Sequence, residues 1–144
     1  KHLPLVYALL FGMPGIPCIY YGSEWGAEGE KHQGDDALRP SFEAPAWNEL
    51  TDWIAALAKA HKESKALCYG DFKQVVLTNK QCIWERIFED ERVLVAVNIG
   101  EQPYTAHFDA KCGMAVDLIT GKPHDFGGGS ELPPYSAYFW KCER

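Results

Sequence analysis

The residues best suited to chemistry lie in one loop-like segment, residues 22–46. The segment carries six acidic residues against two basic ones, and this excess of four negative charges is most of the chain's net charge of −6. Tyr20, Tyr21 and Trp25 stand at its entrance. Aromatic rings beside charged groups suit a polar ligand, and long loops in compact domains are usually functional or disordered. The segment is therefore predicted to be either a polar-ligand cleft or a solvated acidic loop.

Other glycine-rich or serine-containing segments lack the neighbouring residues that a binding or catalytic motif requires. The run Gly127–Gly129 is not followed by the Lys-Ser/Thr pair of a phosphate-binding loop. The glycines of segment 12–15 precede a predicted strand, whereas a dinucleotide site needs them after one. No serine lies in a Gly-x-Ser-x-Gly elbow. We therefore expect no nucleotide-binding site and no serine nucleophile.

The five cysteines show neither a CxxC pair nor a histidine at zinc-finger spacing. No zinc site is therefore expected. An odd cysteine count without close pairs favours reduced, mostly buried thiols in a cytosolic setting, and localisation otherwise stays open. The cysteines are Cys18, Cys68, Cys82, Cys112 and Cys142.

Length and composition limit the class of protein. The chain has 144 residues, 47% of them hydrophobic and 24% charged, as in one globular domain or two small pieces. The net charge of −6 argues against nucleic-acid or anionic-membrane partners. The apolar stretch near the start is broken by Pro and Gly, so we expect no membrane span. No cationic region with a small-residue cleavage site accompanies it, so we expect no signal peptide. Lys1 opens directly onto an apolar helical face without an N-cap, so the chain is expected to be the tail of a longer protein.

Two helices and one strand are predicted before residue 65. The first helix should run over residues 2–11 and stop at Gly12. The apolar run Ile16–Tyr21 suits a strand buried on both faces, as in a parallel sheet flanked by helices. Asn48 can cap a second helix, whose 3, 4, 7 spacing marks one buried face with His61 at its rim. That face consists of Leu50, Trp53, Ile54, Leu57 and His61.

After Lys65 the sequence pattern changes to short runs of β-branched and aromatic residues, separated by residues typical of turns. This pattern predicts an antiparallel β-sandwich, packed on the second helix, with a domain boundary near residue 66. The predicted strands are 72–78, 81–88, 92–99, 104–108, 114–119 and 137–141.

Residues 15–26, Gly-Ile-Pro-Cys-Ile-Tyr-Tyr-Gly-Ser-Glu-Trp-Gly, closely resemble the Gly-x-Pro-x-Ile-Tyr-Tyr-Gly-x-Glu-x-Gly signature of the α-amylase superfamily, glycoside hydrolase family 13. Ser23 stands where the family often has Asp or Thr. Residues 48–63 resemble the family's eighth barrel helix. Residues 66–72 resemble its entry into the C-terminal β-sandwich, and residues 93–98 a strand which that sandwich usually carries. The resemblance spans nearly the whole chain.

The resemblance implies a fold and a binding site. Residues 1–65 would be the C-terminal end of a (β/α)8 TIM barrel, with strand eight at 16–21, and residues 66–144 a C-terminal antiparallel β-sandwich domain. In such a barrel the loop after a strand faces the ligand. The candidate substrate-binding residues are Tyr21, Glu24, Trp25, Asp36 and Arg39. The acidic partner of Arg39 is ambiguous between Asp35 and Asp36, and a loop-bracing salt bridge is the alternative role of the pair.

The same resemblance implies that the chain is part of a retaining glycoside hydrolase or transglycosylase that acts on α-glucans. Such enzymes need two carboxyl groups about 5–5.5 Å apart, which the family carries after barrel strands four and five. The family's Asn-His-Asp motif is absent from this sequence, so we expect no catalytic residue in this chain. No cofactor is expected, and calcium in the parent, linkage specificity and hydrolysis versus transfer stay open.

Two alternatives to this reading stay open. The chain could be a non-catalytic carbohydrate-binding or interaction module that uses Trp84, Tyr104, Tyr138 and Trp140, although alternation along the strands directs many of these into the core. It could also belong to a catalytically dead relative. The first 25 residues should present an apolar face, so we expect either self-association of the chain through them or poor order of these residues. The residues of that face are Leu3, Leu5, Val6, Leu9, Ile19 and Tyr21.

Overall fold

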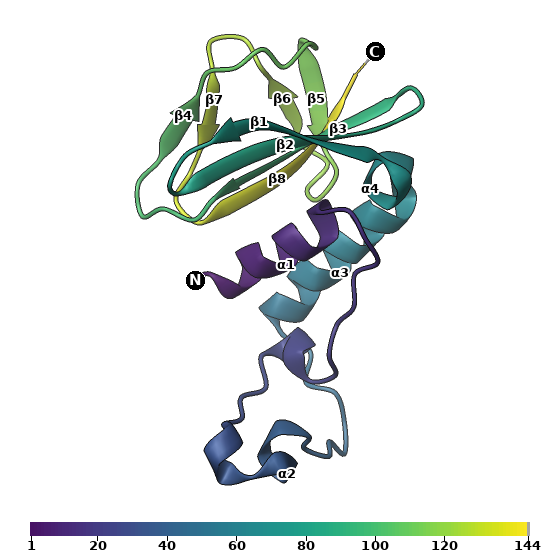
Figure 1. Ribbon diagram of the computed structural model, residues 1–144, viewed down its shortest axis with the longest axis vertical. Coiled ribbons are helices and arrows are strands. Elements are labelled where there is room, and N and C mark those ends of the chain that lie inside the picture. The colour runs from purple at the N-terminus through teal and green to yellow at the C-terminus, as the bar shows by residue number, and fades with distance from the viewer. Residues whose placement is uncertain (144) are drawn as a thin grey trace.

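The computed structural model describes residues 1–143 as a β-sheet covered on one face by helices, with an arm extending below them (Figure 1). The helices are α1 (Leu3–Gly12), α2 (Asp35–Leu38), α3 (Glu49–Glu63) and α4 (Lys65–Tyr69), with single 3-10 turns η1 (Ser23–Trp25) and η2 (Lys31–Gln33). The strands are β1 (Asp71–Leu77), β2 (Gln81–Phe88), β3 (Glu91–Asn98), β4 (Tyr104–Ala106), β5 (Met114–Asp117), β6 (Pro123–Asp125), β7 (Ser130–Leu132) and β8 (Ser136–Cys142).

Six strands form one antiparallel sheet in the order β1-β2-β3-β8-β5-β6, and β4 pairs with β7 in a separate two-stranded ribbon. The antiparallel β prediction is confirmed, and β2 has the predicted bounds. The second layer is the small β4–β7 ribbon with its loops. The strands β6 and β7 were not predicted; each is only three residues long.

Alternation along the central strand β3 divides the interior into two cores. Its side chains at 93, 95 and 97 join the core under the helices, together with Trp84 of β2 and Phe139 of β8. Those at 94 and 96 join a second core under the β4–β7 ribbon. Successive side chains of a strand point to opposite faces, so β3, buried on both faces, reads as a nearly continuous apolar run.

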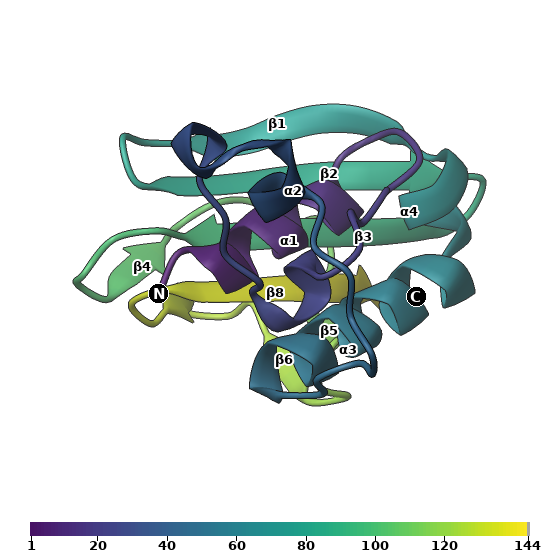
Figure 2. The same ribbon diagram turned by 90° about the horizontal axis from the view of Figure 1, so that it is seen from below.

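The helices begin and end close to where the sequence predicts. Asn48 caps α3 through a capping box in which its side chain accepts a bond from the Thr51 amide and the Thr51 hydroxyl accepts one from the Asn48 amide, both at 3.2 Å. Helices α1 and α4 pack directly against the sheet, and α3 joins the same core mainly through them (Figure 2). Helix α4 was not predicted. Within residues 1–143 no helix is long and apolar enough to cross a membrane.

The end of α1 is fastened to the sheet through one carbonyl group. The Trp84 indole and the Arg86 guanidinium both donate to the Gly12 carbonyl oxygen at 3.0 Å, and Arg86 also donates to Gly70 at 2.9 Å. A Cβ at position 12 would lie 2.8 Å from a Val95 methyl carbon, so only glycine allows this close approach. Residues before and after the predicted boundary at 66 therefore share one core.

The strand predicted at Ile16–Tyr21 is wrong. Residues 16–20 have no regular secondary structure and Tyr21 lies in a turn, and none of the described residues pairs with this segment as a neighbouring strand. The Ile16 side chain is 95% exposed. A parallel strand requires neighbouring strands that accept and donate its backbone hydrogen bonds. An apolar run of residues does not by itself provide such neighbours. The structure thus gives an antiparallel β fold with helices, without a barrel strand in this segment.

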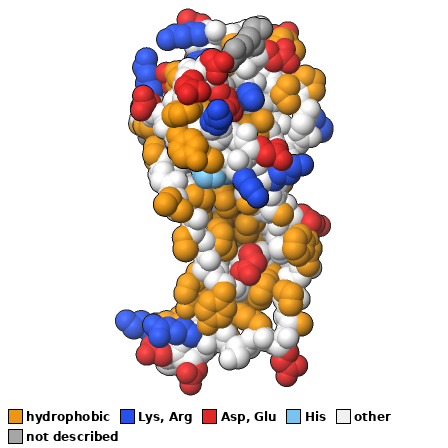
Figure 3. Space-filling view, turned by 90° about the vertical axis from the view of Figure 1, so that its right-hand side faces the viewer, with side chains coloured by type: hydrophobic (Ala, Val, Ile, Leu, Met, Phe, Trp, Pro, Cys, Tyr) orange, Lys and Arg blue, Asp and Glu red, His pale blue; other side chains and the backbone are white. Residues whose placement is uncertain are grey.

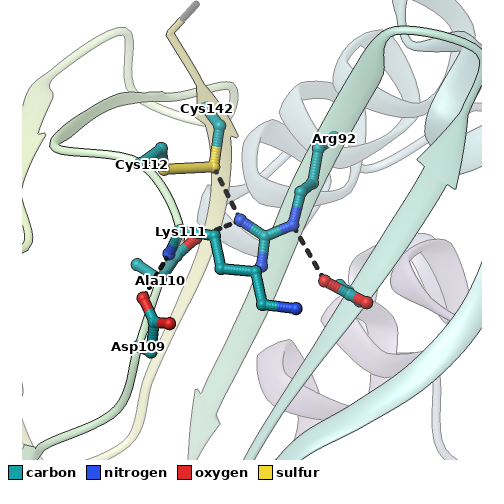
Figure 4. Close-up of a disulfide and its surroundings, with 7 residues drawn as sticks. Arg92, Asp109, Ala110, Lys111, Cys112 and Cys142 are labelled. Atoms are coloured by element: carbon teal, nitrogen blue, oxygen red, sulfur yellow. Dashed lines mark hydrogen bonds and ion pairs between the residues drawn. A yellow bond between two sulfur atoms is a disulfide. The ribbon is translucent and has the colours of Figure 1, made fainter.

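The expectation of five reduced, mostly buried cysteines is also wrong. Cys112 and Cys142 form a disulfide with their Cα atoms 6.1 Å apart (Figure 4). Figure 4 shows Arg92 of β3 reaching the same place, where it donates to the Ala110 carbonyl oxygen and to the Cys142 sulfur. The bridge fastens the loop before β5 to the last strand. Cys18 is free and exposed.

Candidate functional site

The predicted ligand segment, residues 22–46, lies in an arm of residues 13–47. This arm is attached to the helices through its η1 turn. Asn48 donates a side-chain bond to the Trp25 carbonyl oxygen and Thr51 one to that of Glu24, both at 2.9 Å. The Tyr7 hydroxyl of α1 donates to the Ser23 carbonyl oxygen at 3.2 Å. The capped start of α3 thus also holds the η1 turn, which carries Glu24 and Trp25.

A small aromatic cluster forms the floor of the arm, with Phe42 at its centre. The Phe42 ring lies edge-on to the Trp25 ring at 5.1 Å and to the Tyr21 ring at 6.1 Å, measured between ring centres. Gly22 has a φ of +84°, and a Cβ there would lie 2.8 Å from the Phe42 ring. Glycine therefore allows both the turn and the ring contact. Phe42 was not predicted, because only the folded-back chain brings it over Gly22.

Four of the five candidate residues line one cleft of about 580 Å³. Asp36, the fifth, does not line it. The cleft is lined by the aromatic cluster and by the chain from Arg39 to Pro45, to which Phe42 of that cluster belongs. Its lining residues are Tyr21, Glu24, Trp25, Arg39, Pro40, Ser41, Phe42, Glu43, Ala44 and Pro45.

The charged groups of the cleft are suited to accept and donate hydrogen bonds. One carboxylate oxygen of Glu24, Oε2, is buried without a hydrogen-bond partner in the part of the chain that the structure describes. Desolvation and the neighbouring Tyr20 hydroxyl raise the pKa of Tyr21, while the Arg39 guanidinium acts to lower it. The Glu24 carboxylate, together with donors at Arg39 and Tyr21, lines the same cleft, and carboxylates and donors of this kind can bind hydroxyl groups, with Trp25 offering an apolar ring nearby.

The loop-bracing salt bridge that competed with a binding role for Arg39 does not form. No ion pair joins Arg39 to Asp35 or Asp36 among the residues that the structure describes. Both aspartates are exposed in the first turn of α2. Asp36 therefore lies outside the cleft, whereas Arg39 and Tyr21 both line it.

The aromatic residues considered for a binding module in the sandwich are largely core residues. Trp84 and Trp140 are each 1% exposed. Tyr104 and Tyr138 are partly buried against the core under the β4–β7 ribbon. These four rings form no exposed platform, as the alternation along the strands indicated.

Metal-binding side chains do not gather in the described part of the chain: across residues 1–143 no group of three or more His, Cys, Asp or Glu could hold an ion.

No family model matches the chain. It is 32% identical over 131 residues to the cyclomaltodextrin glucanotransferase of Niallia circulans, covering 90% of this chain and 17% of that protein. It is also 32% identical over 100 residues to the α-amylase of Niallia circulans, covering 68% of this chain and 18% of that protein. The chain thus spans less than a fifth of the length of these curated relatives.

The fold has a close counterpart among solved structures. The α-amylase of Geobacillus thermoleovorans, crystallised as a complex with acarbose, superimposes with a TM-score of 0.87 over 99% of this chain and 33% of that one, at 22% identity. That likeness shows the fold, and the sequence matches to glucanotransferases and amylases show the relationship. The chain therefore belongs to the α-amylase superfamily, glycoside hydrolase family 13, and corresponds to a C-terminal portion of a member of that family.

Proposed function

We propose that this chain is part of an α-amylase-type retaining glycoside hydrolase or transglycosylase that acts on α-glucans. Residues 1–65 then correspond to the C-terminal end of its (β/α)8 barrel. Residues 66–144 correspond to its C-terminal β-sandwich domain. The family membership of the chain supports this proposal.

The observation that carries the proposal is the cleft of the arm. It joins an aromatic ring, Trp25, a carboxylate, Glu24, and a cation, Arg39, in the lining of one cleft of about 580 Å³. A glucose unit presents C–H groups on its faces and hydroxyl groups around its rim, so it needs this combination. Tyr21 and Trp25 are proposed to contact the sugar rings, and Glu24 and Arg39 their hydroxyl groups. Asp36 is proposed as an outer contact that requires movement of α2.

The catalytic carboxylates are proposed to come from outside this chain. A retaining mechanism needs a nucleophile and an acid/base carboxyl about 5–5.5 Å apart on either side of the scissile bond. The role proposed for Glu24 is to bind a hydroxyl group from one wall of the cleft. On this view the chain binds glucan weakly and does not cleave it.

The test is a titration of the purified chain with maltoheptaose, followed through the Trp25 indole NMR signal. We expect a saturable shift that Glu24→Gln weakens and that Trp47→Phe, a conservative change outside the cleft lining, leaves unchanged. Incubation with maltooligosaccharides and a nitrophenyl α-glucoside should give no turnover above buffer. Absence of any saturable shift at Trp25 would contradict the binding role, and turnover abolished by Glu24→Gln would contradict the absence of catalytic groups.

We also propose that the chain self-associates through the apolar surface of its first 25 residues. Leu3 and Val6 of α1 and Tyr20 and Tyr21 of the arm are exposed. Apolar side chains also gather over the narrow part of the molecule on the face drawn in Figure 3. Leu5, expected in this surface, is instead 2% exposed and packs in the core. Sedimentation velocity over a range of concentrations should show a rise in mass that Val6→Lys reduces. A strictly monomeric chain would contradict this proposal.

A further inference from the structure

A second hollow, lined by other residues than the arm cleft, lies where three elements begin. The start of α1, the start of α3 and the start of β8 surround a groove of about 560 Å³. In Figure 2 the beginning of α1 lies beside the beginning of β8. The groove is lined by Leu3, Pro4, Leu5, Glu49, Leu50, Trp53, Tyr135, Ser136, Ala137 and Tyr138.

Two partly buried aromatic rings in this groove are held in place by contacts with the start of the chain. The Trp53 indole donates to the Pro4 carbonyl oxygen at 2.8 Å, which fixes the orientation of its ring. Tyr135 lies edge-on to the His2 ring at 5.2 Å between ring centres. Tyr135 also has a φ of +53°, a backbone conformation that non-glycine residues seldom adopt. The two rings are therefore preorganised side chains of the groove.

The groove also borders an unpaired stretch of the edge of β8. Phe139 bonds towards β5, because its amide donates to the Asp117 carboxylate and its carbonyl oxygen accepts from the Leu118 amide. Backbone groups two residues apart on a strand point the same way, so those of Ala137 also point towards the β5 side. The strand β5 pairs only with residues 140–142 of β8. The Ala137 backbone groups are thus left without a strand partner beside the groove.

A carboxylate completes the set of polar groups. Glu49 stands exposed in the first turn of α3 and forms no ion pair with any residue in the described range 1–143. A purely apolar occupant would cover this carboxylate and the Ala137 edge without giving them partners, and burying unpaired polar groups costs free energy. An occupant with apolar faces and hydroxyl groups satisfies both the rings and the polar groups.

From these contacts we propose that the groove is a second binding site for a linear α-glucan, separate from the cleft of the arm. Sugar faces pack on Trp53 and Tyr135, while hydroxyl groups donate to Glu49 and bond the free backbone edge at Ala137. The class of ligand rests on the proposed function, whereas the position of the site rests on the groove itself. Binding here would hold a glucan on the body of the molecule.

The five tryptophans make the two sites separately observable. Trp25 reports the arm cleft and Trp53 the groove, and the buried Trp84 and Trp140 serve as references for global changes. Maltoheptaose is titrated into the isotopically labelled chain at low protein concentration, and the indole signals are followed. We expect a saturable shift at Trp53, with Trp84 unchanged.

Variants locate the ligand within the groove. Tyr135→Gly removes the ring while suiting the positive φ, and it should weaken binding at Trp53 about tenfold, as expected for the loss of one ring contact. Glu49→Gln, on the exposed first turn of α3, should weaken it several-fold without affecting the fold. Tyr69→Ala, an exposed tyrosine that does not line the groove, should leave it unchanged.

The outcomes separate this proposal from the one on the arm. A shift at Trp25 without one at Trp53 would overturn the groove site and leave the arm site standing, and the reverse would do the opposite. A Trp53 shift that persists in both folded variants would also overturn the proposal. So would a Trp53 shift that depends on protein concentration and not on sugar, because the groove would then be a contact between copies of the chain.

Discussion

The body of this molecule and its arm are built in opposite ways. The body, which consists of the sheet with α1, α3 and α4, has two apolar cores and a disulfide. In the arm, residues 13–47, Gly22 is the single buried residue among those described. The arm is held at its start by hydrogen bonds from Tyr7, Asn48 and Thr51. It nevertheless carries the signature by which the sequence resembles its family.

The difference separates the part of the chain that supplies stability from the part proposed to bind the ligand. Burial of apolar side chains stabilises the body, at about 25 cal/mol for each Å² removed from water. The arm keeps rings and charges accessible, as Tyr21 and Arg39 show, and gives up that stabilisation. The body is therefore expected to act as a rigid support for a weakly stabilised binding segment. The experiments that follow compare matched changes in the two regions.

The largest expected effect compares two tryptophans. Trp84→Ala removes a ring that is 1% exposed together with its bond to Gly12, and it should lower the free energy of unfolding by about 3–5 kcal/mol. Trp47→Ala in the arm removes a ring that is 68% exposed, and its effect should stay within about 0.5 kcal/mol. Urea unfolding followed by circular dichroism measures both. Equal losses for the two variants would contradict the division into body and arm.

The second comparison concerns cysteines. Cys142→Ser opens a bridge that joins residues 30 positions apart, and it should destabilise the oxidised protein by about 2–4 kcal/mol. Cys18→Ser in the arm should have almost no effect, because that thiol is free and exposed. Thermal unfolding with and without a reductant gives the measurement. If reduction changes the transition of the Cys142→Ser variant as much as that of the unaltered protein, the disulfide is not the cause.

A third, smaller effect is expected at the junction of the two regions. Asn48→Ala removes the cap of α3 and should cost about 1 kcal/mol of stability. It also removes the bond to the Trp25 carbonyl oxygen, so hydrogen exchange in residues 22–26 should become faster than in the unaltered chain. Asn48→Asp keeps the cap but not the amide donor, and it should loosen the arm alone. Unchanged exchange in both variants would show that Asn48 does not hold the arm.

The smallest effect is a pH dependence confined to the body. Desolvation, aided by the nearby Arg86 guanidinium, lowers the pKa of His61 below its ordinary value of 6.5. The unfolded chain therefore binds a proton before the folded one does, and the stability contributed above pH 6.5 is lost as the pH falls towards the lowered pKa. Urea midpoints at pH 7.5 and 5.5 should differ less in His61→Asn than in the unaltered protein. An identical difference in both would rule out His61 as the cause.

Local signals predicted the elements that local chemistry determines. Asn48 and the apolar spacing after it indicated α3, and Gly12 indicated the end of α1. The strands β2 and β3 were predictable because their residues alternate or are apolar throughout. The segment 16–21 was misjudged because a strand requires neighbours, and no local pattern supplies them.

The candidate site was predictable only in part, for the same physical reason. The signature brought Tyr21, Glu24 and Trp25 into consideration, and all three line the cleft. Phe42 could not be found, since its role depends on how the chain returns over Gly22. The disulfide was missed because a separation of 30 residues says nothing about distance in space.

Hydrogen exchange of the whole chain with and without maltoheptaose tests the central claim, that a stable body carries a weakly stabilised binding arm. We expect α1 and the strands β2, β3 and β8 to exchange slowly in both conditions. Residues 20–26 should exchange fast in the free chain and more slowly with sugar. An arm protected as well as β3 without sugar, or one whose exchange the sugar does not change, would contradict the account.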